Sequence, residues 1–252
     1  MALPILERGE TLGGSPVKVV IVSDIHANFA ALSALPDSYD ELWVLGDLVN
    51  YGPCPAEAVD WVRAHAGVVV RGNHDHAVGF GCEPFASPEF REMAQATQKM
   101  SESLLNSAQK SYLKQLPLRA ELKRQGTLFY LCHAIPSDPL YAYCGADSER
   151  WAGECRKIQA DVLLVGHTHS PFIRRMGSCT IVNPGSLGQP KTGSPEACYA
   201  VWEDGKIELK TFSYPIEETV AAIRGLHLAQ KIQCQLISVL RTGQAPAGGV
   251  AK

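Results

Sequence analysis

Residues that can bind metal ions follow five short apolar runs of the sequence. These residues are Asp24 and His26 after run 17–23, Asp47 after 41–45, Asn73 to Asp75 after 67–71, His133 after 127–132, and His167 and His169 after 161–165. Carboxylate, amide and imidazole groups together suit borderline transition metals. A buried cluster of Asp and His without a cation would be costly, because charged groups lose hydration and like charges repel. The sequence therefore predicts that these residues form one site for divalent cations.

The apolar runs themselves are predicted strands. Runs 17–23, 41–46 and 67–72 are short, apolar and rich in Val and Leu, which is typical of strands buried on both faces. Helices are predicted between them, at 27–36 and 56–66. This β-α-β-α-β order with short connections indicates parallel strands covered by helices. In open α/β sheets the ligand crevice lies at the carboxyl ends of the strands, where the candidate ligands stand.

The rest of the chain is predicted to alternate helices and short antiparallel strands. One or two helices are expected in the polar segment 88–116, followed by a hairpin around Gln125–Gly126, a helix at 148–160 and a strand at 161–166. Later strands are expected at 172–176, 179–183, 198–203 and 206–214, and C-terminal helices at 215–230 and 231–241. The chain is predicted to have a flexible lead-in at 1–16, a single domain over 17–241 and a disordered tail at 242–252.

Composition excludes several classes of protein. The 252 residues carry a net charge of −3 and a pI near 6.2, which disfavours a general nucleic-acid or anionic-membrane binder. No apolar stretch reaches the roughly 18 residues of a membrane span, and the first 16 residues do not resemble a signal peptide. The eight cysteines form no CxxC pair, so a cytoplasmic protein with reduced thiols is predicted. The sequence does not indicate an oligomeric state.

The motifs occur in an order that resembles the calcineurin-like metallophosphoesterases. They are D-x-H at 24–26, G-D at 46–47, G-N-H-D at 72–75, His133, and G-H-T-H at 166–169. The segments SDIHANFAAL (23–32), WVLGDLVNYGPCP (43–55), VRGNHD (70–75) and VNPGSLGQP (182–190) resemble the small bacterial branch that includes YfcE-like phosphodiesterases and relatives of diadenosine tetraphosphate hydrolases. The resemblance covers about residues 17–215. It implies an α/β fold, a four-layer α-β-β-α sandwich of two mixed sheets flanked by helices.

The resemblance also implies a role for each motif residue. One metal ion would be bound by Asp24, His26 and His169, the other by Asn73, His133 and His167, and Asp47 would bridge the two. The ions would be divalent or trivalent Mn, Fe, Zn or Co, which lower the pKa of a bridging water and stabilise the reacting phosphoryl group. His74 would be the proton donor to the leaving oxygen, with Asp75 orienting its ring. Asn73 is also expected to contact substrate. Asn28 either contacts phosphate or only begins a helix.

We therefore expect a dimetal enzyme that hydrolyses phosphomonoesters or phosphodiesters of a small molecule or nucleotide. Protein phosphatases and classical symmetrical dinucleoside tetraphosphate hydrolases carry G-D-x-x-D-R-G in the second motif, but residues 46–52 contain no Arg. Both remain weaker alternatives. A non-catalytic scaffold, the alternative from another class, typically lacks the histidine that is present here as His74. A nuclease is disfavoured because the chain lacks a basic excess and room for an accessory domain. Tyr141, Tyr143 and segment 80–116 either shape the substrate pocket or pack.

Overall fold

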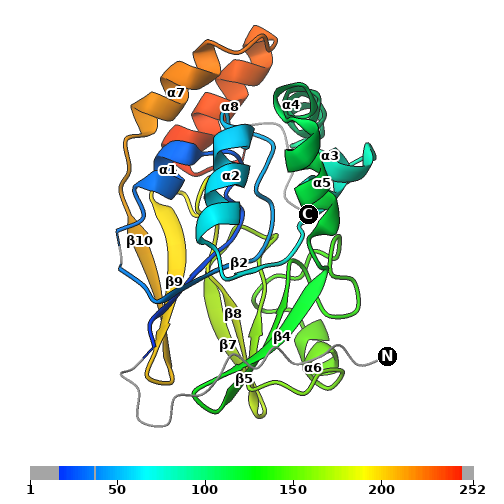
Figure 1. Cartoon of the computed structure of the whole chain (residues 1–252), viewed down its shortest axis with the longest axis vertical. Coiled ribbons are helices and arrows are strands. Elements are labelled where there is room, and N and C mark those ends of the chain that lie inside the picture. The colour runs from blue at the N-terminus through cyan, green and yellow to red at the C-terminus, as the bar shows by residue number, and fades with distance from the viewer. Residues whose placement is uncertain (1–16, 37, 246–252) are drawn as a thin grey trace.

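Two five-stranded sheets lie face to face in the structure, a computed structural model that describes residues 17–36 and 38–245 (Figure 1). The first sheet has the order β10-β9-β1-β2-β3, with β1 (Val19–Val22), β2 (Glu41–Val44), β3 (Val68–Val69), β9 (Ala197–Glu203) and β10 (Lys206–Phe212). The second has the order β4-β5-β6-β8-β7, with β4 (Arg119–Arg124), β5 (Thr127–Cys132), β6 (Val162–Leu164), β7 (Phe172–Met176) and β8 (Cys179–Asn183).

Each sheet contains three neighbouring strands that pair in parallel, and two further strands that are joined to the sheet by antiparallel pairing. Strands β1, β2 and β3 are parallel, as the sequence predicts, and so are β5, β6 and β8. Strands β9 and β10 extend the first sheet in antiparallel fashion, and β4 and β7 form the edges of the second. The carboxyl ends of the parallel strands in each sheet, and the loops that follow them, therefore lie at the same end of that sheet.

Both faces of the central strands are buried, which explains their unbroken apolar sequence. Along β1, Val19 and Ile21 pack in the core between the sheets, whereas Val20 and Val22 pack against helices. Side chains of a strand point alternately to opposite faces, so only a strand covered on both sides has no polar positions. The core between the sheets is completed by large side chains such as Trp43, Phe129 and Trp202.

Eight helices of the described residues cover the outer faces and one end of the sheets. They are α1 (Phe29–Ser33), α2 (Pro55–His65), α3 (Asn73–Phe80), α4 (Arg91–Leu104), α5 (Ser107–Gln115), α6 (Arg150–Cys155), α7 (Ile216–Arg224) and α8 (Gln230–Thr242). Helices α1 and α2 pack on the first sheet, and Trp151 of α6 packs on the second. Helices α4, α7 and α8 share a cluster at the top of Figure 1. The four-layer sandwich of two mixed sheets flanked by helices is confirmed.

Several helix boundaries differ from the sequence prediction for local reasons. The helix predicted at 27–36 covers only 29–33, because Asn28 caps its N-terminus. Segment 88–116 forms two helices, because the Asn106 side chain starts a new one with Gln109 as its capping partner. The helices predicted at 148–160 and 215–230 end early, at Cys155 and Arg224. Helix α3 was not predicted: it has no apolar periodicity, and it begins inside the G-N-H-D motif.

The predicted lead-in at 1–16 lies outside the described residues, and so does most of the predicted tail. Helix α8 continues to Thr242, and Gly243 ends it in a left-handed conformation with φ of 62°. The division into a single domain over 17–241 stays a prediction, as does the cytoplasmic location. Within the described ranges no helix is both long and apolar enough to cross a lipid bilayer.

Candidate metal centre

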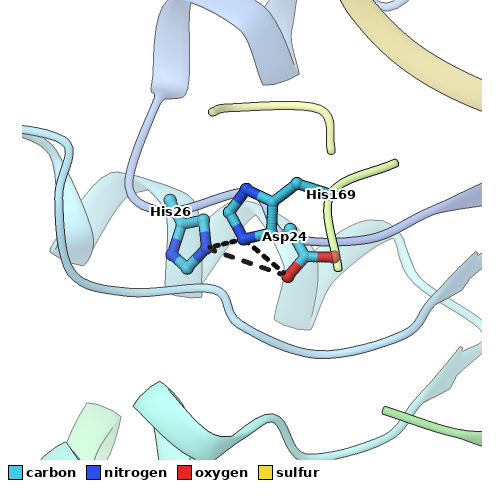
Figure 2. Close-up of side chains that lie close together, drawn as sticks. All are labelled: Asp24, His26 and His169. Atoms are coloured by element: carbon cyan, nitrogen blue, oxygen red, sulfur yellow. Dashed lines mark hydrogen bonds and ion pairs between the residues drawn. The ribbon is translucent and has the colours of Figure 1, made fainter. Parts of the chain in front are cut away.

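One group of predicted ligands comes together beyond the ends of β1 and β6. Figure 2 shows the side chains of Asp24, His26 and His169 converging from three positions of the chain. Nε2 of His26 lies 3.1 Å from Nε2 of His169, and Oδ1 of Asp24 lies 3.2 Å from His169 Nε2 and 3.8 Å from His26 Nε2. All three residues are buried. One ion could contact all three ligand atoms.

A second group forms beyond β2, β3 and β5. Nε2 of His133 lies 3.2 Å from Oδ2 of Asp47 and 3.1 Å from Oδ1 of Asn73. Ligand atoms of Asp47, His133 and His167 lie within 4.8 Å of one another. The Asn73 amide is oriented by Pro84, whose carbonyl accepts a 2.7 Å hydrogen bond from Nδ2. This bond leaves the amide oxygen, the atom that can bind a cation, facing the group.

Asp47 lies between the two groups. Its Oδ2 is 3.2 Å from Nε2 of His133 in the second group and 3.8 Å from Nε2 of His26 in the first. The structure thus brings together all seven residues that the sequence predicted as ligands. It also places the predicted bridging carboxylate where it can reach both groups.

Hydrogen bonds to the histidine rings fit metal binding. Nδ1 of His26, His133 and His169 lies 2.6–3.0 Å from the carbonyl oxygens of Val49, Leu45 and Gln189, respectively. A carbonyl can only accept, so each Nδ1 carries the proton and a neutral ring presents an unprotonated Nε2. Two such Nε2 atoms, of His26 and His169, cannot bond each other. Among the described residues, buried Oδ1 of Asp24 also has no hydrogen-bond donor. A cation would satisfy all three atoms.

The electrostatics of the groups agree with this interpretation. Burial lowers the pKa of His167 to about 3 and that of His26 well below its usual value, so both rings are neutral, as metal ligands must be. Burial also acts against protonation of His133, but the Asp47 carboxylate raises the pKa of His133 to about 9. A proton on His133 therefore balances the negative charge of Asp47, and a bound cation could balance the same charge.

The loops that carry the ligands have an unusual backbone. Left-handed φ values between 47° and 66° occur at five proposed ligands, namely Asp24, His26, Asp47, His167 and His169. This conformation costs roughly 1–2 kcal/mol for a residue other than glycine. Such strain gathers where surrounding structure enforces it, most often at functional sites. The loops of Asp47 and Asn73 can approach closely because residue 72 is Gly. A Cβ at this position would lie 2.0 Å from Oδ1 of Asp47.

The structure corrects the role predicted for Asp75. Its carboxylate accepts hydrogen bonds of 2.7–3.0 Å from the backbone N–H groups of Asp47, Leu48 and Gly72, and not from the His74 ring. Burial raises the pKa of Asp75 to about 7, with a further contribution from Asp47, whereas the bonds from Gly72 and Leu48 lower it. Asp75 sits at the third position of α3, where a carboxylate can reach back to the chain before the helix. Asp75 therefore positions the loop of Asp47.

Asn50 contacts the His74 ring instead. Its Nδ2 lies 2.8 Å from Nδ1 of His74. Because an amide N–H only donates, Nδ1 accepts, and a neutral ring carries its proton on Nε2. Burial lowers the pKa of His74 to about 4, so the ring is neutral at pH 7. The sequence motifs assign no role to Asn50, although it stands in the second motif, within the stretch where the Arg-containing relatives differ.

Asn28 is not available to a substrate phosphate. Its Nδ2 donates to the Gly188 carbonyl and to the Tyr214 hydroxyl, both at 2.9 Å. Its Oδ1 accepts from Thr219 at 2.8 Å and from the backbone of Ala31 at 3.3 Å. Both donors and both lone pairs are therefore used, and the side chain is buried. Of the two predicted alternatives, the structure supports the helix-capping one and corrects the phosphate contact.

A cavity of about 200 Å³ opens beside the second group. Its walls include Asp47, Asn73, His74, His167 and His169. The remaining lining residues are Tyr51, Phe85, Ala86, Ser87, Phe90, Tyr141, Tyr143 and Lys191. Both predicted tyrosines and part of segment 80–116 thus line the cavity.

Lys191 is a second residue at this site to which the sequence motifs assign no role. Among the described residues that line this cavity it alone has a cationic side chain, and its Nζ lies 4.2 Å from the centre of the Phe90 ring. Burial lowers the pKa of Lys191 to about 8, although Asp24 and Glu89 act in the opposite direction. Its only signal in the sequence was that it directly follows the VNPGSLGQP segment.

The structure predicts that Asp75→Asn destabilises the protein and weakens metal binding together. An amide keeps one oxygen, so at least one buried N–H loses its acceptor, at a cost of about 1–3 kcal/mol. Glu154→Gln is the matched control, because Glu154 is also buried and accepts hydrogen bonds from Ser137, which is not a proposed ligand. Chemical denaturation and metal analysis should show destabilisation in both variants and metal loss only in Asp75→Asn. Unchanged metal content in Asp75→Asn would contradict the positioning role.

Comparison with known proteins identifies the family. The model of the calcineurin-like phosphoesterase superfamily domain matches residues 17–205. The chain belongs to this superfamily, and it is a metal-dependent phosphoester hydrolase. The predicted resemblance to its YfcE-like branch is also confirmed.

Individual relatives cover most of the chain. The uncharacterized protein MJ0912 of Methanocaldococcus jannaschii is 28% identical over 81% of this chain and 91% of its own length. Phosphodiesterase YfcE of Escherichia coli is 25% identical over 71% of this chain and 84% of its own. The crystal structure of a metallophosphoesterase from Sphaerobacter thermophilus has a TM-score of 0.77 and 29% identity, over 90% of this chain and 99% of that one.

Proposed function

We propose that this chain hydrolyses small-molecule or nucleotide phosphodiesters and phosphomonoesters at a two-metal site. The observation that carries the proposal is the position of Asp47, whose Oδ2 lies within 3.8 Å of a histidine from each ligand group. One ion is assigned to Asp24, His26 and His169, and the other to Asn73, His133 and His167. This mixture of imidazole, carboxylate and amide ligands suits Mn, Fe, Zn or Co, and we propose manganese as the first to test.

Different residues of the chain would have different roles in the reaction. When bound, two metal ions supply a water of lowered pKa and neutralise charge on the phosphoryl oxygens. Asp47 holds the two sites together, and Asn73 borders the cavity where substrate would lie. Lys191 offers one further positive charge to a phosphoryl oxygen. His74, whose neutral ring carries its proton on Nε2, would donate a hydrogen bond from Nε2 to the leaving oxygen, while Asn50 holds the ring through Nδ1.

The charged residue in the cavity wall is compatible with diester substrates. Arg binds two phosphate oxygens through a planar fork, whereas the ammonium of Lys acts as a point charge and does not require two free oxygens. Residues 46–52 contain no Arg, and Lys191 is the cation that lines the cavity. A substrate with a second ester group could therefore bind as well as one with a dianionic phosphate.

We expect bis(p-nitrophenyl) phosphate to be hydrolysed at least as efficiently as p-nitrophenyl phosphate. The two esters release the same nitrophenolate, so kcat/KM values measured with Mn²⁺ and with Fe²⁺ compare how the site accepts them. Addition of a chelator should abolish both activities. Strict selectivity for monoesters, phosphoproteins or dinucleoside polyphosphates would instead support the alternatives given by the sequence.

A further inference from the structure

Two large aromatic side chains at the cavity are exposed. Phe85 is 66% exposed and Tyr143 is 62% exposed, yet both line the same cavity as Asp47 and His74. Most large apolar side chains of the fold are buried in its core clusters. Exposed aromatic rings grouped at one site, next to polar groups, are typical of a binding surface.

Contacts tie both rings to the proposed metal ligands. The Phe85 ring stands edge-on to Tyr141, with 5.2 Å between ring centres, and the preceding residue, Pro84, accepts the hydrogen bond that orients Asn73. Phe85 itself has a left-handed φ of 53°. The Tyr143 ring lies 5.9 Å from that of His167, and its hydroxyl donates to the Thr168 carbonyl over 3.4 Å. Both rings are therefore held beside the ligands that would face the phosphoryl group.

The size of the cavity indicates which part of a substrate these rings meet. Pockets that enclose a drug-sized ligand measure roughly 300–1,000 Å³, whereas this cavity measures about 200 Å³. A phosphate ester larger than the cavity must leave part of itself outside. Phe85 and Tyr143 present exposed aromatic surface to that part, and such rings bind flat π-systems by stacking.

We propose that Phe85 and Tyr143 bind the base of a nucleotide substrate, so that the preferred substrates are phosphate esters of nucleosides. This inference rests on the phosphoesterase function proposed above. A base offers a flat face to the rings and polar edges to the groups nearby, which include the Ser87 and Lys191 side chains. Stacking does not distinguish strongly among bases, so we expect preference for a base over none, with little selectivity between bases.

The test compares two diesters that differ only in the base. One is the p-nitrophenyl ester of thymidine 5′-monophosphate, and the other is the p-nitrophenyl ester of 1,2-dideoxyribose 5-phosphate, in which hydrogen replaces the base. Stacking of a base on an aromatic side chain corresponds to a factor of about 5–150, and we expect the kcat/KM ratio of the two esters to fall in this range. Phe85→Ala and Tyr143→Ala should each lower the ratio towards one, mainly through KM.

Control variants separate stacking from general damage. Phe85→Trp and Tyr143→Phe keep an aromatic ring and should retain the ratio. Ile173→Ala removes a 45% exposed apolar side chain on β7, away from the cavity lining, and should leave the ratio unchanged. Inhibition by thymidine monophosphate and by the phosphate without the base provides a second readout that needs no turnover of either ester. The inhibition constants should differ in the wild type and converge in the alanine variants.

The outcomes distinguish this inference from the function on which it rests. Equal kcat/KM for the two esters in the wild type would overturn base binding and leave the phosphoesterase intact. A high ratio that persists in both alanine variants would overturn the assignment to Phe85 and Tyr143. Failure to hydrolyse either ester with any of the four metals would overturn the proposed function itself.

Discussion

Asp47→Asn is expected to lower metal content and activity together, with a loss of about 10³-fold or more in kcat/KM. Its Oδ2 faces histidines of both ligand groups, and an amide in its place lacks the charge that compensates two cations. Metal analysis of protein prepared with Mn²⁺ should find two ions per chain in the wild type and less than one in this variant. Steady-state kinetics with bis(p-nitrophenyl) phosphate measure the loss of activity.

Asp24→Asn is the matched comparison for the bridge. Asp24 belongs to the first group, where Oδ1 lies 3.2 Å from His169, so its replacement should reduce occupancy of that site more than the other. Asp47→Asn should reduce both. Full occupancy and full activity in Asp47→Asn would disprove the bridging role, and equal patterns in the two variants would mean that Asp47 serves only one ion.

His74→Ala is expected to keep its metal ions and to lose activity according to the leaving group. A hydrogen bond from Nε2 of His74 would stabilise the charge that develops on the leaving oxygen, and removal of one such donor typically costs about 10²–10³-fold. The developing charge is greatest on a departing alkoxide, so alkyl phosphate esters should lose most of that factor, whereas a nitrophenolate delocalises its charge and its esters should lose less. The ratio of variant to wild-type rate across esters of increasing leaving-group pKa measures this dependence.

Two results would reassign His74. A loss that is the same for every leaving group, with metal content retained, would mean that the ring contacts another part of the phosphate instead of the leaving oxygen. A loss that follows metal content would mean that His74 acts through the ligand groups, to which its backbone N–H is already linked by a 2.9 Å hydrogen bond to Asp47.

The sequence alone predicted the fold class and the seven proposed metal ligands. Strands such as β1 and β6 are recognisable because burial on both faces leaves no polar positions, and a polar residue directly after such a strand must lie at the edge of its sheet. Asp24 and His169 are 145 positions apart, yet each is placed by its own strand. Local pattern therefore located the candidate ligands, and the resemblance to the calcineurin-like metallophosphoesterases separated the seven ligands from His74 and Asp75.

Only the tertiary structure decided the roles of residues in the loops. The partner of the His74 ring is Asn50 and not the neighbouring Asp75, because left-handed turns at Asp47 and Asn50 bring their loop against α3. The Asn28 side chain already forms hydrogen bonds with Thr219 and Gly188, which lie far from it in the sequence. The direction of a side chain in a loop depends on backbone angles that are enforced by residues nearby in space. The spacing of residues in the sequence does not show which residues those are.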